Sequence, residues 1–277
     1  MNISINQNTI MQCGTEEFMI VSAEAGFEGV ELRIEKIRNT LYKKSIKEII
    51  NLVKKLKINI ISLNALEDFS FVPEQNLEVL KAECNFIGKM CEMLECPMVV
   101  ACPTRNVERI DNSLTDKDII RITKSKLSFI ENIFSKYSVQ VGFEPIGFPE
   151  YSIRDLNNTR ELFKESNVKS AGIVIDIYNL FRGGVSPTEV KNLGNLIALV
   201  HLNDAVEDIP FEKLHVLHNR TFPGEGTANA KKWVDLINKE SYKGYFSLEL
   251  FNKEIWDMKA GKAADLCYRK IKNFLCI

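Results

Sequence analysis

The pentapeptide GIVID, residues 172–176, is apolar and largely β-branched until it ends in a carboxylate. A strand that is apolar on both faces belongs in a parallel sheet covered by helices, because a half-exposed strand alternates apolar and polar residues. Seven further short runs have the same character. The predicted strands are Ile3–Asn6, Gly29–Arg33, Ile58–Asn64, Met98–Ala101, Val139–Glu144, Gly172–Asp176, Ala198–Asn203 and Tyr245–Leu250.

Longer amphipathic segments separate these runs. In Ser45–Leu56, Ile46, Ile49, Ile50 and Val53 recur at i, i+3 and i+4, which places them on one face of a helix. The other predicted helices are Glu74–Leu94, Asp116–Tyr137, Arg154–Glu165, Ala230–Lys239 and Ala260–Leu275. Eight units in 277 residues give roughly 35 residues each, the length of one βα crossover.

The architecture is either an open doubly wound sheet or a closed barrel. An open sheet that binds a dinucleotide carries a GxGxxG turn after its first strand, and Ile3–Thr15 has none. No low-complexity stretch or long Pro/Gly linker divides the chain. We therefore expect a single-domain (β/α)8 TIM barrel over residues 1–277, with the long connection Ala205–Thr227 covering its mouth.

Composition and charge exclude several classes of function. With a net charge of −1, the chain lacks the basic surface that a nucleic-acid or anionic-membrane partner requires. Residues 1–13 do not resemble a signal peptide, and no apolar run approaches the roughly 20 residues of a membrane span. The seven cysteines form no CxxC pair, which favours free thiols. We expect a cytoplasmic protein with a small-molecule partner; the sequence leaves a homo-oligomer open.

Polar residues close several predicted strands, at the end where a barrel builds its active site. A charged group that follows an apolar strand is costly to bury unpaired, and the nearby cations are few. A bound divalent metal ion would supply the missing counter-charge. The candidate ligands are Glu144, Asp176, His201 and Glu249. Three carboxylates and one imidazole suit Mn²⁺, Zn²⁺, Co²⁺ or Mg²⁺. The alternative is that each residue is a salt-bridge or capping residue at a strand end.

Several stretches, in this order along nearly the whole chain, resemble the xylose-isomerase-like superfamily of sugar isomerases and epimerases (the AP endonuclease 2 superfamily). Within it the resemblance is strongest to the 2-keto-myo-inositol isomerases. The matching stretches are Val30–Arg33, Ser62–Leu66, Gly142–Glu144, Gly172–Asp176, His201–Asp204, Arg220–Gly226 and Ser247–Phe251.

This resemblance implies one divalent metal ion held by Glu144, Asp176, His201 and Glu249. It also implies that Glu144 and Glu249 exchange substrate protons and that Arg220 holds a hydroxyl or carbonyl oxygen of the substrate. A metal-polarised carbonyl acidifies the neighbouring proton, and an enediol(ate) follows when a glutamate removes it. Reprotonation at the adjacent carbon gives isomerisation, and reprotonation on the opposite face gives epimerisation.

Other candidate substrate-binding residues have a structural alternative. Glu31 and Asn64 would bond sugar hydroxyls or support the strand-end network, and Trp256 would stack on a substrate ring or pack in the core. Asn179 and Phe148 stand where the related enzymes usually have histidines near the substrate, which puts the exact substrate in doubt. His215 and His218, in the long connection, are expected to be solvated rather than ligating.

Three other functions compete with an isomerase or epimerase. A metal-dependent dehydratase of an inosose or dehydroshikimate-type substrate shares the proton abstraction and differs in expelling a β-hydroxyl. An endonuclease of the same fold needs several zinc ions and a basic face, which three histidines and the net charge of −1 do not supply. A non-catalytic sugar-binding relative would keep the barrel and show no α-proton exchange.

Overall fold

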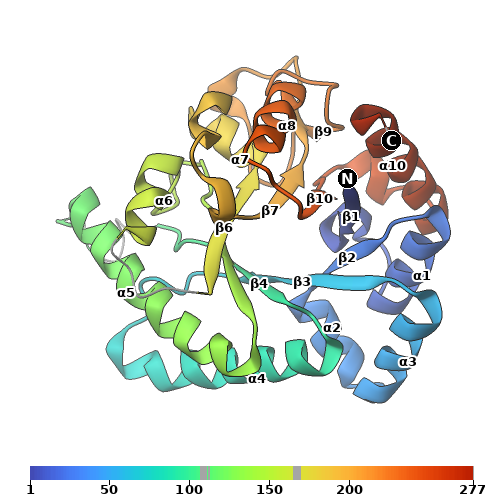
Figure 1. Ribbon diagram of the computed structural model, residues 1–277, viewed down its shortest axis with the longest axis horizontal. Helices are drawn as coiled ribbons and strands as arrows, with labels where there is room; N and C mark the ends of the chain where they lie inside the picture. The colour runs from blue at the N-terminus through green and yellow to red at the C-terminus, as the bar shows by residue number, and fades with distance from the viewer. Residues whose placement is uncertain (107–110, 112, 165–169, 277) are drawn as a thin grey trace.

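Parallel strands close into a barrel in the computed structural model of the chain, which describes residues 1–106, 111, 113–164 and 170–276 (Figure 1). Every barrel strand has two neighbours, because the first strand pairs with both the second and the last. The strands, in spatial order, are β1 (Asn2–Asn6), β10 (Tyr245–Leu248), β7 (Ile197–Leu202), β6 (Ala171–Asp176), β5 (Gln140–Phe143), β4 (Met98–Ala101), β3 (Asn59–Leu66) and β2 (Gly29–Arg33). The predicted (β/α)8 TIM barrel is confirmed.

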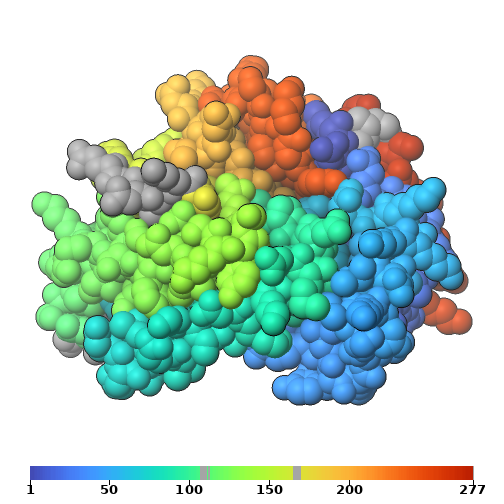
Figure 2. Space-filling model, turned by 60° about the horizontal axis from the view of Figure 1, so that its bottom comes forward, coloured from blue at the N-terminus to red at the C-terminus, as the bar shows by residue number. Residues whose placement is uncertain are grey.

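Helices surround the strands and cover them from outside (Figure 1). In the space-filling view, the blue to green segments of the first half of the chain form much of the outer surface on the face shown (Figure 2). They are α1 (Thr15–Ala25), α2 (Ile34–Leu41), α3 (Ile46–Leu56), α4 (Leu77–Leu94), α5 (Asp116–Phe134), α6 (Leu156–Phe163), α7 (Ile177–Arg182), α8 (Ala230–Lys239), α9 (Lys253–Trp256) and α10 (Ala260–Leu275). Four of these helices, α1, α2, α7 and α9, are not among those predicted from the sequence. Of the predicted helix Arg154–Glu165, the last residue lies outside the described residues.

The helix ends follow ordinary capping chemistry. Thr115 caps α5 by accepting from the amide of Asp118, and the Asp118 side chain accepts from the Thr115 amide in return. Glu74–Asn76 and Ser135–Tyr137, both predicted as α-helix, are 3-10 turns that precede α4 and follow α5.

The connection after β7 is more ordered than the sequence analysis predicts. Within it, β8 (Asp204–Ala205) pairs antiparallel with β9 (Arg220–Thr221). The buried Asp204 carboxylate anchors this segment by accepting from the amides of Gly224 (3.0 Å) and Ala228 (2.7 Å). The pairing of β8 with β9 brings the connection back toward the barrel, so that Arg220 of β9 reaches Asp176 at the barrel mouth.

The structure bears on two further predictions, those about the cysteines and about membrane spans. All seven cysteines are free, and six of them are buried. None of the described helices is long and apolar enough to cross a membrane.

Candidate metal centre

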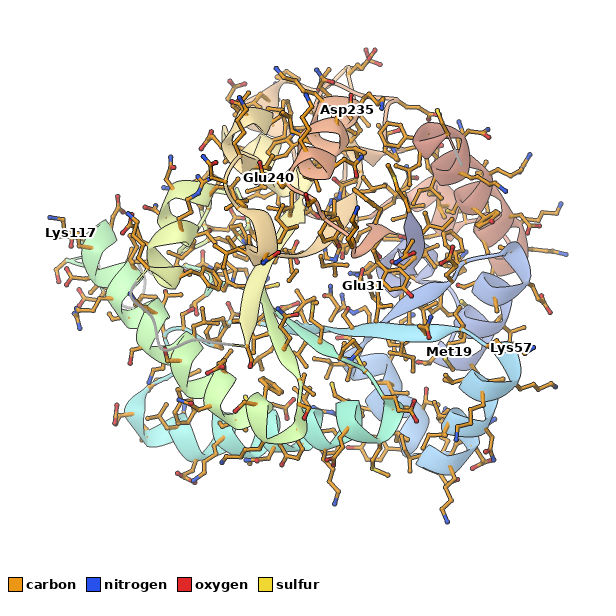
Figure 3. The ribbon with its side chains drawn as sticks, in the orientation of Figure 1. Met19, Glu31, Lys57, Lys117, Asp235 and Glu240 are labelled. Atoms are coloured by element: carbon orange, nitrogen blue, oxygen red, sulfur yellow. The ribbon has the colours of Figure 1, made fainter. Side chains whose placement is uncertain are left out.

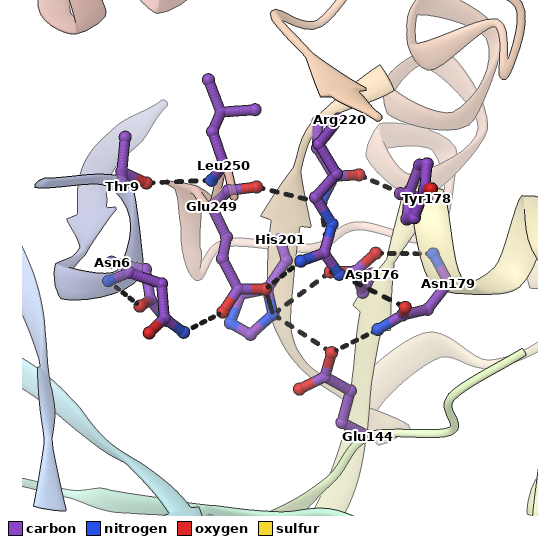
Figure 4. Close-up of polar contacts among 12 residues, drawn as sticks. Asn6, Thr9, Glu144, Asp176, Tyr178, Asn179, His201, Arg220, Glu249 and Leu250 are labelled. Carbon is purple, nitrogen blue, oxygen red and sulfur yellow. Dashed lines mark hydrogen bonds and ion pairs between the residues drawn. The ribbon is translucent and has the colours of Figure 1, made fainter. Parts of the chain in front are cut away.

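Four neighbouring strands bring the predicted ligands together. Glu144 follows β5, Asp176 ends β6, His201 lies in β7, and Glu249 follows β10. These strands are consecutive in the barrel, so their ends converge on one point. Asp176 and His201 are direct partners in the register of β6 and β7. All four side chains are buried, and one ligand atom from each lies within 4.8 Å of the others (Figure 4).

The Nδ1 atom of His201 faces three carboxylates. It lies 3.2 Å from Glu249 Oε2, 3.6 Å from Glu144 Oε1 and 3.8 Å from Asp176 Oδ2. Among the described residues this buried nitrogen has no hydrogen-bond partner. A buried polar atom without a hydrogen-bond partner is rare. A ring nitrogen that faces the same small space as three carboxylate oxygens is placed as a cation ligand would be.

The charges of this region also fit a divalent ion. Four buried carboxylates (Glu31, Glu144, Asp176 and Glu249) surround the equally buried His201 and Arg220. With all four carboxylates ionised and the imidazole protonated, the two positive groups balance only two of the four negative charges. Two negative charges remain without a counter-charge. Buried charge of this kind is costly unless paired, and a divalent cation would balance it. The three carboxylates and one imidazole that we take as ligands therefore suit such an ion.

The cluster shifts the proton affinities of its members. Burial alone would lower the pKa of His201, but the charges of Glu31, Glu249 and Glu144 raise it well above its usual value. Burial raises the pKa of Asp176 to about 7, against the opposing charge of Arg220. For Glu249 burial acts in the same upward direction, but the imidazole of His201 outweighs it and lowers the pKa. Without an ion, the cluster thus holds protons that a bound cation would displace.

Arg220 is a buried residue of this site. Its Nη2 donates to Asp176 Oδ2 (3.1 Å) and to Asn179 Oδ1 (3.2 Å). The guanidinium packs against two aromatic rings, 5.0 Å from the centroid of Tyr178 and 4.6 Å from that of Phe251. Within the described part of the chain, its Nε and Nη1 lack hydrogen-bond partners. Nη1 lies 3.9 Å from Glu249 Oε2, too far for a hydrogen bond, so Nη1 and Nε both remain as donors for a ligand oxygen.

Asn179 is bound to the protein through both ends of its amide. Its Nδ2 donates to Glu144 Oε1 at 2.9 Å, while Oδ1 accepts from Arg220. The Asn179 backbone amide also donates to Asp176 Oδ1, because Asp176 is the N-cap of α7. The structure thus places Asn179 as a support for Glu144 and Arg220. Substrate binding through the second N–H of Nδ2 stays a prediction.

Glu31 and Asn64 differ in their surroundings. Glu31 is fully buried, and its carboxylate accepts from Ser62 and Ser247 and contacts His201. It is therefore not placed to bond a sugar hydroxyl, and the structural alternative, a role in the strand-end network, fits its position. Asn64 is 5% exposed and lines a cavity of about 340 Å³. Its Nδ2 has no hydrogen-bond partner among the described residues, so substrate binding stays a prediction there.

The two predicted aromatic residues support the rings that pack against Arg220. Phe148, 3% exposed, packs in the core with its ring centroid 6.0 Å from that of Tyr178. Trp256 packs edge-on against Phe251 at 6.4 Å and donates from Nε1 to the Asn8 carbonyl. Phe148 is thus a packing residue behind the site, and substrate stacking by the half-buried Trp256 stays a prediction.

Two asparagines that were not predicted as site residues hold the candidate ligands in place. Asn8, just after β1, donates to Glu249 Oε1 at 3.0 Å and accepts from Arg33 at 2.7 Å. Asn203, just after β7, donates to Asp176 Oδ2 at 3.1 Å. Both are polar residues at strand ends, which is the signal that could have identified them. His215 and His218, by contrast, lie exposed in the long connection with their rings stacked, as expected for solvated residues.

Comparison with known proteins gives consistent matches. The family model described as "Xylose isomerase-like TIM barrel" matches residues 21–270. An inosose isomerase of Halalkalibacterium halodurans is 24% identical over 240 residues, which cover 86% of this chain and 83% of that protein. A 3-dehydroshikimate dehydratase of Pseudomonas putida is also 24% identical, over 88% of this chain but only 37% of its own length. A crystal structure titled as IOLI protein with a binding zinc atom superimposes with a TM-score of 0.92 at 20% identity, covering 99% of this chain and 98% of that one.

Proposed function

The chain belongs to the xylose isomerase-like TIM barrel family, and from this premise we propose that it is a metal-dependent isomerase or epimerase of a ketose or keto-inositol. The observation that carries the proposal is the position of His201 Nδ1, buried and facing the carboxylates of Glu144, Asp176 and Glu249. The similarity to proteins named inosose isomerase supports a cyclitol ketone as substrate.

The four ligand residues would hold the ion, and other groups would act on the substrate. A divalent ion bound there would polarise a substrate carbonyl, which makes the neighbouring C–H bond more acidic. Glu249, whose pKa is lowered, is a carboxylate at neutral pH and can accept that proton. Glu144 would take up a proton from solvent and return it at the adjacent carbon or on the opposite face, and Glu249 would release its proton to solvent, which restores both carboxylates. The two free donors of Arg220 would hold a substrate oxygen beside the rings of Tyr178 and Phe251.

A dehydratase is the second candidate. It is favoured by the similarity to a 3-dehydroshikimate dehydratase and to a crystal structure titled as a probable enzyme of that kind, which superimposes with a TM-score of 0.80. Both reactions begin with removal of a proton next to a carbonyl. They differ in whether the resulting intermediate is reprotonated or loses a β-hydroxyl as water.

Incubation in deuterated water separates these functions. The metal-loaded chain would be mixed with 2-keto-myo-inositol, ketohexoses and dehydroshikimate, and the products analysed by NMR and mass spectrometry. We expect deuterium at the carbon next to the carbonyl together with an isomeric product. Loss of water from the substrate would identify the dehydratase instead. If no ketone showed exchange, an isomeric product or loss of water, both enzymes would be refuted.

Uptake of the ion is expected to release protons in a number that depends on pH. His201 must lose its proton to ligate, and its raised pKa means that it carries one at neutral pH in the metal-free chain. Asp176, with a pKa of about 7, carries a second proton only below that pH. Titration calorimetry in buffers of different ionisation enthalpy should therefore show more protons released per ion at pH 6 than at pH 8, with a difference of about one proton from Asp176. An affinity that is constant over this range would contradict the assignment of His201 as a ligand.

A further inference from the structure

Glu31 occupies the interior of the barrel, behind His201 as seen from the metal centre. Figure 3 places Glu31 within the ring of strands, whereas Lys57 and Lys117 lie outside it. Its Oε1 and Oε2 atoms lie 3.1 and 3.2 Å from Nε2 of His201, the ring nitrogen that does not face the cluster. The imidazole therefore lies between the Glu31 carboxylate on one side and the three ligand carboxylates on the other.

Two serines from different strands of the barrel fix the Glu31 carboxylate. Ser62 of β3 donates its hydroxyl to Oε2 at 2.6 Å, and Ser247 of β10 donates to Oε1. Both hydroxyls, the carboxylate and the His201 ring are completely buried. Because each carboxylate oxygen already has a serine partner and a contact with His201, the carboxylate has one fixed orientation. In this orientation the carboxylate faces Nε2 of His201, so a proton on Nε2 would be donated to Glu31.

We propose that Glu31 is a positioning residue, which holds the proton of His201 on Nε2 and thereby presents the lone pair of Nδ1 to the metal ion. This inference rests on the proposed function, because it concerns the same metal centre. A ring nitrogen that donates to a carboxylate fixes the tautomer and orientation of a ligating histidine and makes the other nitrogen a stronger ligand. Glu31 itself does not touch the ion or the substrate.

A purely structural role for Glu31 predicts a different outcome. A buried glutamate whose hydrogen bonds only support the fold would, when replaced, lower the stability of the chain and leave the metal affinity of the folded fraction unchanged. The chain offers such a residue for comparison. Glu131 on α5 is 5% exposed, and its carboxylate accepts at 3.0 Å from the backbone amide of Ser170, which precedes β6 at the end opposite to Asp176.

The experiment compares zinc affinity in the full-length wild type and in Glu31→Gln, Glu31→Leu and Glu131→Gln, by competition with a chromophoric chelator. Gln keeps the shape and one acceptor oxygen, while Leu removes every acceptor for Nε2–H. We expect affinity losses of about 10-fold for Glu31→Gln and about 100-fold for Glu31→Leu, and no change for Glu131→Gln. Thermal unfolding followed by circular dichroism identifies any variant that fails to fold. If the Leu variant fails to fold, the near-isosteric Gln variant still tests the proposal.

A second readout reports the tautomer itself. Nitrogen-15 NMR of the zinc-loaded wild type should show the His201 imidazole with its proton on Nε2 and with the Nδ1 resonance shifted by the bound ion. Wild-type affinity in both folded Glu31 variants would overturn the role of Glu31 and leave the metal centre intact. A wild-type chain that takes up no zinc would overturn the metal centre and this inference together.

Discussion

Replacement of Glu249 by glutamine is expected to slow deuterium exchange into a keto-inositol by about 10²- to 10⁴-fold. Glutamine has nearly the same shape, and its amide oxygen can still accept from Nδ2 of Asn8, which lies 3.0 Å from Glu249 Oε1. It cannot accept the substrate proton. Since the pKa of Glu249 is lowered, the wild-type side chain is already ionised as a base at neutral pH, and that capacity is lost in the variant.

Because Glu249 is also a proposed ligand, metal content must be measured on the same samples. Glu144→Gln tests the second proton-transfer group, and the exposed Glu254→Gln, just beyond the same strand, is the matched control that should retain full activity. Rates would be compared at equal metal occupancy. A double variant with both glutamines that is fully metallated and fully active would refute proton transfer by these glutamates.

Replacement of Arg220 by methionine is expected to lower kcat/KM by about 10²- to 10³-fold, the typical cost of removing a donor that stabilises charge developing on the substrate. Methionine fills much of the space beside Tyr178 and Phe251 but offers no donor. It also leaves the fully buried Asp176 without its guanidinium partner. The free energy of unfolding should therefore fall by about 3–5 kcal/mol, as when one partner of a buried ion pair is removed.

Arg220→Lys separates charge from geometry. Lysine keeps a positive charge near Asp176 but lacks the planar fork that reaches Asp176 and Asn179 while leaving two donors free. We expect most of the stability to return and most of the activity loss to remain. Steady-state kinetics and urea denaturation of both variants give the two quantities. Unchanged kcat/KM in the methionine variant would show that Arg220 has no part in substrate binding.

The fold could be predicted because each strand carries its own signal. Runs such as GIVID at 172–176 are apolar on both faces, and the whole of Gly172–Asp176 is buried between the barrel interior and the helices. The missed helices have weaker signals. In α7, Ile177 follows β6 directly, and Asp176 is at once the last strand residue, the N-cap of the helix and a candidate ligand. No turn residue separates the two elements, so the sequence reads as one apolar run.

The candidate ligands could be predicted for a similar reason, since strand ends converge in any parallel barrel. The roles of their supports could not, because those roles depend on depth and on contacts between distant segments. Glu31 is a glutamate like two of the candidate ligands, but it contacts Nε2 of His201, the ring nitrogen that faces away from the cluster, and it is fully buried there. Arg220 looks like a loop residue in the sequence, and only the pairing of β8 with β9 brings it to Asp176.

The most direct measurement of metal dependence is deuterium exchange by one preparation of the chain, first stripped with a chelator and then reloaded stepwise with zinc or manganese. The substrate would be the ketone that exchanges fastest in the screen. We predict no exchange by the stripped chain and a return of activity that rises linearly and stops at one ion per chain. Equal exchange rates before and after stripping, or reloading that leaves no ion bound to the folded chain, would contradict a metal centre formed by Glu144, Asp176, His201 and Glu249.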